Sequence, residues 1–302
     1  MKPSVKVQKY HTYAGHKDCL YALDMIDDQR FVSAGADGMV VLWDLQDFEK
    51  GKVIARISSS CYALCYHRNE DLLLIGQNFQ GLHLINVEDS KEVASLRLNE
   101  AAIFDIQRDG DEVFVATGTG EVFHIYLPAL KIIRRFKDSQ KSARSIALTD
   151  EFVMVGYSDN CIRVYNRNLQ LISEFEAHTV SVFTLQADLS RGLLVSGSRD
   201  AHIKAWELGT FELKHDVVAH MYAINHISYS RDGQHFVSCS MDKSVKIWDA
   251  ESLQLRKVID KGRHAGHGTS VNKTLWMPYH DLLVTCSDDR SIAVWKIKIG
   301  DK

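Results

Sequence analysis

The chain has 302 residues, of which 45% are hydrophobic and 25% charged, and its formal net charge at pH 7 is −3. This balance is typical of an ordinary globular protein and argues against a general nucleic-acid binder, which would be strongly basic. No apolar run approaches the ~20 residues that cross a bilayer, and the N-terminus lacks the apolar core of a signal peptide. The six cysteines are scattered without a C-x-x-C pair, so we expect free thiols in a reducing compartment, the cytoplasm, and no contact with a membrane.

In chain order, the first predicted element is a strand over residues 5–13. It is followed by four residue types at fixed spacing, namely His16, a hydroxyl at Ser33, Asp37 and Trp43. The same spacing returns three times in the second half of the chain, with the hydroxyl four residues before the Asp and the Trp six after it. These three sets are His178, Ser196, Asp200 and Trp206; His220, Ser238, Asp242 and Trp248; and His267, Thr285, Asp289 and Trp295. Recurrence at four places indicates a repeat protein.

Three weaker copies lie between the first and second of these sets, over residues 79–86, 119–126 and 159–166. None has a matching His. They carry Ile75, Val115 and Val155 in place of the hydroxyl, and Ile85, Ile125 and Tyr165 in place of the Trp. Apolar packing can hold such a unit together without the polar set. Residues 37, 79, 119, 159, 200, 242 and 289 then mark seven units with a period of 40 to 47 residues.

The last repeat shows how each unit is built. Residues 271–276, 282–286 and 291–297 read as three short strands separated by turns, with no amphipathic helix among them. A period of this length with four strands per unit is typical of a β-propeller, whose blades must stack around an axis to bury their faces. The seventh unit lacks a fourth strand, and we expect residues 5–13 to supply it and so remove an open sheet edge. The prediction is an all-β, seven-bladed β-propeller of four-stranded blades, one domain over residues 1–302 without tail or linker.

The Gly15-His16 and Trp43-Asp44 dipeptides, with Ser33 and Asp37 between them, make the chain resemble the WD-repeat β-propeller family over essentially its full length. The resemblance implies that the Trp indole donates to the hydroxyl, which bonds the His, which bonds the Asp. A Ser-His-Asp trio is also the set of a hydrolase, but a hydrolase has one trio beside a cleft and an oxyanion hole. Four trios at repeat spacing, each with a Trp, favour a structural role. We therefore predict no catalytic residue and no enzyme activity.

Two other sequence features could suggest a metal site or a phosphate-binding loop, but each has a simpler interpretation. His264 and His267 lie three residues apart, but His267 belongs to a structural set and no carboxylate or Cys lies at ligand spacing. Residues 117–120 form a Gly-rich turn without the following helix that phosphate-binding loops use. No metal and no cofactor is predicted.

The resemblance also implies that the face carrying the His and Asp turns, here called the His–Asp face, binds peptides through a central ring of side chains. That ring is Tyr21, Tyr62, Phe104, Arg144, Phe183, Asn225 and Asn272. A second ring precedes each reference position and contains Ala36, Asn78, Gly118, Ser158, Arg199, Met241 and Asp288, of which Arg199 joins the predicted partner-binding set. Aromatic residues and Arg are enriched at binding hot spots. The alternative is that these side chains merely fill the central channel.

Charge placement suggests what kind of partner would bind. Basic residues within 134–144 and 256–263 are expected near turns of the His–Asp face, whereas acidic pairs such as Asp27-Asp28 and Glu70-Asp71 are expected on the opposite face. A basic face can attract an acidic partner. The predicted function is a non-catalytic protein–protein interaction scaffold. Two alternatives stay open, namely single-stranded nucleic-acid binding through the basic turns, although nucleic acid is not the expected partner, and a propeller enzyme with a site in the channel.

Overall fold

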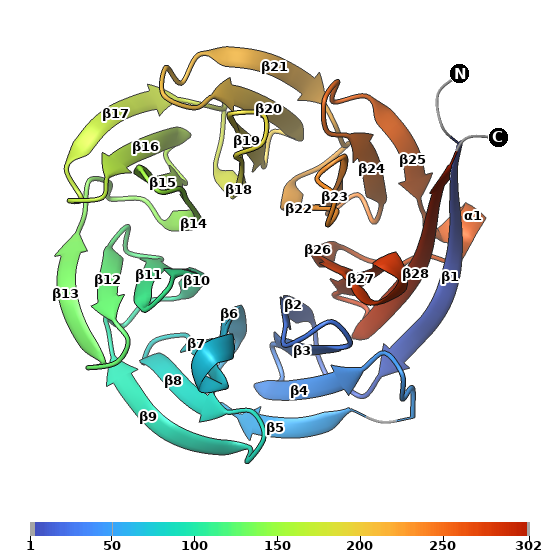
Figure 1. Cartoon of the computed structure of the whole chain (residues 1–302), viewed down its shortest axis with the longest axis horizontal. Coiled ribbons are helices and arrows are strands. Elements are labelled where there is room, and N and C mark those ends of the chain that lie inside the picture. The colour runs from blue at the N-terminus through green and yellow to red at the C-terminus, as the bar shows by residue number, and fades with distance from the viewer. Residues whose placement is uncertain (1–3, 50, 301–302) are drawn as a thin grey trace.

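The computed structural model describes residues 4–49 and 51–300, which form seven four-stranded antiparallel sheets arranged as blades around a central opening (Figure 1). This confirms the predicted seven-bladed β-propeller. Blades 1 to 3 consist of β2 (Leu20–Met25), β3 (Arg30–Gly35), β4 (Met39–Asp44) and β5 (Lys52–Arg56); β6 (Cys61–His67), β7 (Leu72–Gln77), β8 (Gly81–Asn86) and β9 (Lys91–Arg97); and β10 (Ile103–Asp109), β11 (Glu112–Thr117), β12 (Val122–Tyr126) and β13 (Lys131–Phe136).

The remaining blades follow the same order, with the innermost strand first in the chain. Blades 4 to 6 consist of β14 (Ala143–Leu148), β15 (Phe152–Tyr157), β16 (Cys161–Asn166) and β17 (Leu171–Glu176); β18 (Val182–Asp188), β19 (Leu193–Ser198), β20 (His202–Glu207) and β21 (Leu213–Val218); and β22 (Ile224–Tyr229), β23 (His235–Ser240), β24 (Val245–Asp249) and β25 (Leu255–Ile259). Blade 7 consists of β26 (Val271–Met277), β27 (Leu282–Ser287), β28 (Ser291–Gly300) and β1 (Ser4–Ala14).

The N-terminal strand closes the ring, as predicted. β1 pairs antiparallel with β28, with a register that runs from Ser4 opposite Gly300 to Ala14 opposite Ser291. The two strands lie side by side at the edge of the molecule in Figure 1. Both extend beyond the predicted ranges, because each supplies the hydrogen-bonding partner that the other would otherwise lack.

The hydrophobic core is divided among the contacts between neighbouring blades. The cluster between blades 7 and 1, for example, joins Met277 and Val284 to Leu20, Phe31 and Trp43. The second strand of a blade is buried along almost its whole length, as in β23, whereas outer strands such as β21 alternate between exposed and half-buried residues. This pattern follows from position, because the inner strands are covered by blades on both sides.

In the described part of the chain, three short helices that the sequence did not predict lie between strands. They are η1 (Arg68–Glu70), α1 (Lys261–His264) and η2 (Tyr279–Asp281). The α1 turn begins after Asp260, whose side chain accepts a hydrogen bond from the Arg263 amide, and it lies in the long connection that makes the last repeat spacing 47 residues. No helix within residues 4–49 and 51–300 has the length and apolar character to span a membrane.

Candidate functional site

In blade 1 the predicted polar residues form one continuous hydrogen-bonded chain. The Trp43 indole Nε1 donates to Ser33 Oγ at 2.7 Å, Ser33 Oγ lies 2.8 Å from His16 Nε2, and His16 Nδ1 lies 2.9 Å from an Asp37 carboxylate oxygen. A carboxylate can only accept, so Nδ1 carries the imidazole proton and the Ser33 hydroxyl donates to Nε2. Every member of the chain is therefore satisfied.

Blades 5, 6 and 7 repeat this arrangement. The Trp-to-hydroxyl distances are 2.9, 2.8 and 2.9 Å, the hydroxyl-to-imidazole distances 2.8, 2.7 and 2.9 Å, and the imidazole-to-carboxylate distances 3.0, 2.9 and 3.0 Å. The four hydroxyl-bearing residues are all 0% exposed: Ser33, Ser196, Ser238 and Thr285. A hydroxyl without access to solvent cannot attack a substrate, so the geometry of these trios favours the structural interpretation over a hydrolase.

The carboxylate of each set also fixes two turns. Asp242 accepts hydrogen bonds from the backbone amides of Met221 and Ser244, in addition to the bond from His220. It therefore ties the connection from β21 to β22 to the turn between β23 and β24. The corresponding carboxylates of the other three sets accept amide bonds from the same relative positions.

The ionisation of these sets predicts a loss of stability on acidification. Burial lowers the pKa of His16, His178 and His220 below the usual 6.5, although the paired carboxylate opposes this shift. Burial alone would raise the pKa of Asp200 and Asp242, but the hydrogen bond from the imidazole holds it well below the usual 3.8. In each case the folded state binds fewer protons than the unfolded state, so stability falls as pH decreases.

We expect the midpoint of thermal unfolding to fall first below pH 6.5, as the histidines begin to bind protons in the unfolded chain, and again below pH 3.8 as the carboxylates do. Scanning calorimetry between pH 8 and pH 3 measures the midpoint, and an NMR titration of the imidazoles supplies the histidine pKa values. A midpoint that stays constant or rises between pH 7 and pH 5 would contradict this assignment.

Blades 2, 3 and 4 lack this set, as predicted, but other polar groups bridge the equivalent turns. In blade 3 the Asn99 amide donates to Thr119 Oγ1 at 2.7 Å and to Glu121 Oε2 at 2.6 Å. In blade 4 the Ser139 hydroxyl donates to Asp159 at 2.6 Å. These blades therefore combine apolar packing with polar bonds of their own. Asn99 and Ser139 both lie 20 residues before their reference positions, a regularity in the sequence that could have identified them.

Blade 4 also replaces the Trp bond with a tyrosine bond. The Tyr165 hydroxyl donates to Asp138 Oδ2 at 2.9 Å, and the Tyr157 hydroxyl lies 3.3 Å from it. In blade 2 the Gln77 amide donates to Ser58 Oγ at 2.8 Å. These bonds satisfy buried polar atoms at positions where the strong repeats use the imidazole.

The seven predicted ring residues all line one cavity of about 350 Å³ at the centre of the molecule. Each is the second residue of an innermost strand, and in every blade the strand register shifts at that residue. A β-bulge leaves its extra residue unpaired and re-aims the side chain. The repeated bulge accounts for seven side chains from seven blades converging on one space.

Five of the ring residues form a continuous stack around the cavity. The rings of Tyr21 and Tyr62 are 4.9 Å apart, and those of Tyr62 and Phe104 are 5.7 Å apart. The guanidinium carbon of Arg144 then lies 3.8 Å from the centre of the Phe104 ring and 4.5 Å from that of Phe183. Such contacts between aromatic rings and a guanidinium are favourable and hold the side chains in fixed positions.

The other predicted partner-binding residues are placed differently. The Asn225 side-chain amide donates to the carbonyl of Val271, and the Asn272 amide donates to the carbonyl of Leu20 and to Asp288. Both line the cavity, but their amide protons link neighbouring blades. Arg199 is exposed in the turn between β19 and β20 and is not among the residues that line the cavity.

Arg144 has an unusual environment for a cation. Within residues 4–49 and 51–300, no group accepts a hydrogen bond from its guanidinium, and its buried Nε atom has no partner. Burial lowers the pKa of Arg144 to about 10. The half-buried side chain remains cationic at neutral pH, and no neighbouring carboxylate of the described residues compensates its charge.

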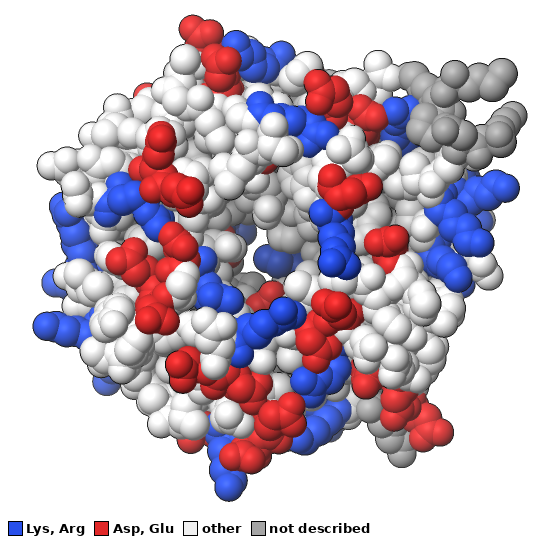
Figure 2. Space-filling view, viewed as in Figure 1, with Lys and Arg blue, Asp and Glu red and all other residues white. Residues whose placement is uncertain are grey.

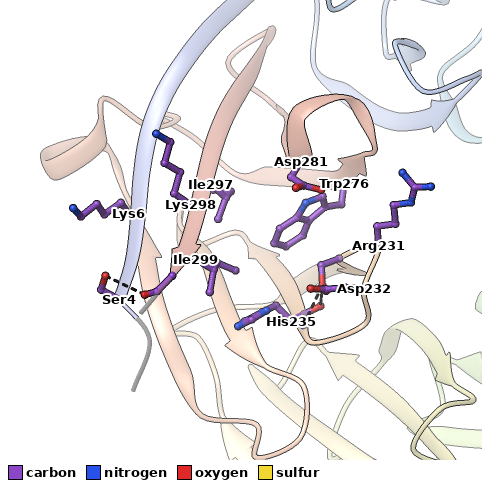
Figure 3. A pocket seen from close by; sticks show the side chains of 12 residues that line it. Ser4, Lys6, Arg231, Asp232, His235, Trp276, Asp281, Ile297, Lys298 and Ile299 are labelled. Carbon is purple, nitrogen blue, oxygen red and sulfur yellow. Dashed lines mark hydrogen bonds between the residues drawn. The ribbon is translucent and has the colours of Figure 1, made fainter. Parts of the chain in front are cut away.

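A second and larger cavity, of about 880 Å³, lies on the face opposite the His–Asp face, between blades 6 and 7. Figure 3 shows Trp276, His235 and Ile299 facing the same space, beside the ends of β1 and β28. The half-buried ring of Trp276 packs against the core shared by blades 6 and 7. The larger cavity is lined by residues of two blades, whereas the central cavity is lined by at least one side chain from each of the seven blades.

The predicted separation of charge between the two faces is wrong for several residues. Arg134 donates from β13 to the carbonyl of Asn168, and Arg256 pairs with Asp249, so both reach the opposite face. Figure 2 views that face, on which acidic and basic side chains are interspersed around a central hollow. Arg30 and Arg191, for example, pair with carboxylates there. The error has a simple cause, because the long side chain of an outer-strand residue reaches the nearest hydrogen-bond acceptor or carboxylate rather than the turn nearest in sequence.

The comparisons with known proteins agree with this geometry. The family model described as "WD domain, G-beta repeat" matches residues 7–44, 169–207, 211–249 and 260–296, which contain the four complete polar sets. The chain is 30% identical over 281 residues to apoptotic protease-activating factor 1 of Homo sapiens, covering 91% of this chain and 22% of that protein. It is 23% identical over 296 residues to actin-interacting protein 1 of Caenorhabditis elegans, covering 94% of this chain and 47% of that one.

The chain therefore spans about a fifth of the length of the human relative and about half that of the nematode one. Among solved structures, the WD40 β-propeller domain of Doa1 aligns with a TM-score of 0.86 at 20% sequence identity, covering 96% of both chains. This likeness establishes the shared fold.

Proposed function

Because this chain belongs to the WD-repeat family, whose propellers generally bind other proteins, we propose that it is a non-catalytic scaffold that captures a peptide or loop of a partner protein on its His–Asp face. The central cavity is the proposed site, and the segment it captures is acidic. The free thiols of its six cysteines fit a reducing compartment, and we infer that the protein acts in the cytoplasm.

The observation that carries this proposal is the convergence of four aromatic side chains and one arginine on the central cavity. Aromatic residues and Arg contribute most of the binding energy at protein interfaces, because they bury a large area with few torsions to restrict. The side chains of Tyr62, Phe104 and Phe183 are only half-buried, so part of each ring is available to a partner.

A further apolar surface lies on the same face, in two turns of blade 6. Met221, Tyr222 and Met241 are 81%, 62% and 51% exposed, and a hydrogen bond from the Met241 amide to the Ala223 carbonyl joins the two turns that carry them. Exposed apolar patches commonly mark interaction surfaces. A captured segment can therefore extend from the cavity across blade 6.

Replacing Tyr62, Phe104 and Phe183 together by Ala is expected to abolish partner capture with little change in thermal stability, because these rings contribute more to the cavity than to the blade cores. Quantitative affinity purification with mass spectrometry, from a cell that produces the protein, measures capture. Trp276→Ala tests the larger cavity on the opposite face in the same way. Unchanged capture by the triple variant, or loss of capture only in Trp276→Ala, would exclude the central cavity as the site.

A further inference from the structure

Two aromatic rings limit how a ligand can approach the Arg144 guanidinium. The rings of Phe104 and Phe183 lie against it from the two neighbouring blades, with their centres 3.8 and 4.5 Å from the guanidinium carbon. Its Nε atom is buried, so the terminal N–H groups at the edge of the plane are the part left for a partner in the cavity. A ligand in the cavity therefore meets these terminal donors, which form a planar fork.

The other charged groups of the cavity do not satisfy this fork. Asp105 also lines the cavity, but it accepts hydrogen bonds from the Ile146 amide, the Ser145 hydroxyl and the Gln107 side chain. A buried cation without a partner is costly, and an anion that pairs with it removes that cost. A planar carboxylate matches the guanidinium fork with two parallel hydrogen bonds.

We propose that the central cavity is a carboxylate-binding subsite, in which the edge of Arg144 receives the side-chain carboxylate of a Glu or Asp on the captured segment of the partner protein. This inference rests on the proposed function. Phe104 and Phe183 act as the two walls that hold the guanidinium in place, so the positive charge is fixed before the partner arrives and little order must be gained on binding.

The surroundings favour a single carboxylate over the repeated phosphates of a nucleic acid. Lys273 is the other cationic side chain that lines the cavity, while Asp105 lies within it and the Asp288 carboxylate beside it accepts from Asn272. A nucleic-acid strand is bound by a groove of several cations that follows its backbone. Two cations among carboxylates do not make such a groove.

Amidated nonapeptides with randomised flanks and a central Glu, Asp, Gln, Asn or Arg provide the probe. We expect the tightest Glu- or Asp-centred peptides to lose about tenfold or more in affinity when that residue becomes Gln or Asn, as measured by fluorescence anisotropy. Arg144→Gln should remove this preference, and Arg144→Lys, which keeps the charge without the planar fork, should retain only part of it. Lys17→Gln removes an exposed cation of the same face that does not line the cavity, and this matched control should keep the preference.

Equal affinity for Glu and Gln peptides, or a preference that survives in Arg144→Gln, would overturn the inference. So would binding that requires a free C-terminal carboxylate, or tight binding of an oligo(dT) strand in place of acidic peptides. If Arg144→Gln does not fold, the inference is tested by the ratio of the affinities for Glu and Gln peptides, measured for the wild-type protein and for Arg144→Lys. The proposed function fails separately, when peptide binding of any kind survives in the triple Tyr62, Phe104 and Phe183 variant.

Discussion

Removal of residues 1–13 is expected to lower the midpoint of thermal unfolding by more than about 10 °C, far more than the loss of a frayed terminus would. β1 is the fourth strand of blade 7, although it lies at the other end of the chain from β26, β27 and β28. Its loss leaves β28 as an open edge from Ile292 to Gly300, and the first and last blades are then held together only by their shared core and the hydrogen bonds between them. An unpaired edge of this length is also a template for aggregation. Calorimetry and size-exclusion chromatography measure both effects.

Point variants separate the role of β1 in packing from its role in pairing. Tyr13 is 3% exposed, contacts the rings of Trp43 and Phe31, and donates its hydroxyl proton to the Asp44 carbonyl. Tyr13→Ala is expected to cost about 3–5 kcal/mol, as for other buried aromatic side chains. Thr12→Ala, the exposed neighbour on the same strand, should have little effect. If the truncated chain melts within 2 or 3 degrees of the full one, closure by β1 does not stabilise the ring.

Asp242→Ala is expected to destabilise the protein by about 3 kcal/mol. The change removes the acceptor of the buried His220 N–H, of the Met221 and Ser244 amides and of the Ser244 hydroxyl, so four donors lose this partner. His220 is 4% exposed and water cannot readily replace the carboxylate at its Nδ1 atom. Denaturation by urea, followed by circular dichroism, measures the change in the free energy of unfolding.

Asp28→Ala is the matched control for this change, because Asp28 is exposed in the turn between β2 and β3 and only its backbone carbonyl is hydrogen-bonded. It should shift the unfolding free energy by less than about 0.5 kcal/mol. Similar shifts for Asp242→Ala and Asp28→Ala would mean that the polar set of blade 6 contributes no net stability, and that its recurrence needs another explanation.

The fold could be predicted because the repeat spacing carries most of the information. The strand expected over 271–276 is β26 (Val271–Met277), and the N-terminal run that had no place in the first repeat is the missing strand of the last. The α1 turn could not be predicted, because four residues that include Gly262 have no helical periodicity. The spacing of 47 residues indicated only that something longer occupied this connection.

The positions of the residues that line the candidate site could be predicted, but the contacts among their side chains could not. The seven ring positions follow from repeat alignment, and all of them reach the cavity. The sequence did not indicate that Arg144 would lie between Phe104 and Phe183, since the three residues belong to different blades. The sequence also did not indicate that the side-chain amides of Asn225 and Asn272 donate hydrogen bonds to backbone carbonyls of neighbouring blades. Side-chain pairing between repeats depends on the closed ring, which a linear alignment does not contain.

Site-specific photo-crosslinking tests the central claim most directly, that partners bind on the His–Asp face. A photoreactive phenylalanine analogue can replace Met241, an exposed residue of that face, or Leu189, an equally apolar and exposed residue of the turn between β18 and β19 on the opposite face. We expect the Met241 position to crosslink the partner in cells and the Leu189 position not to. Crosslinks that form at Leu189 and are absent at Met241 would contradict the account.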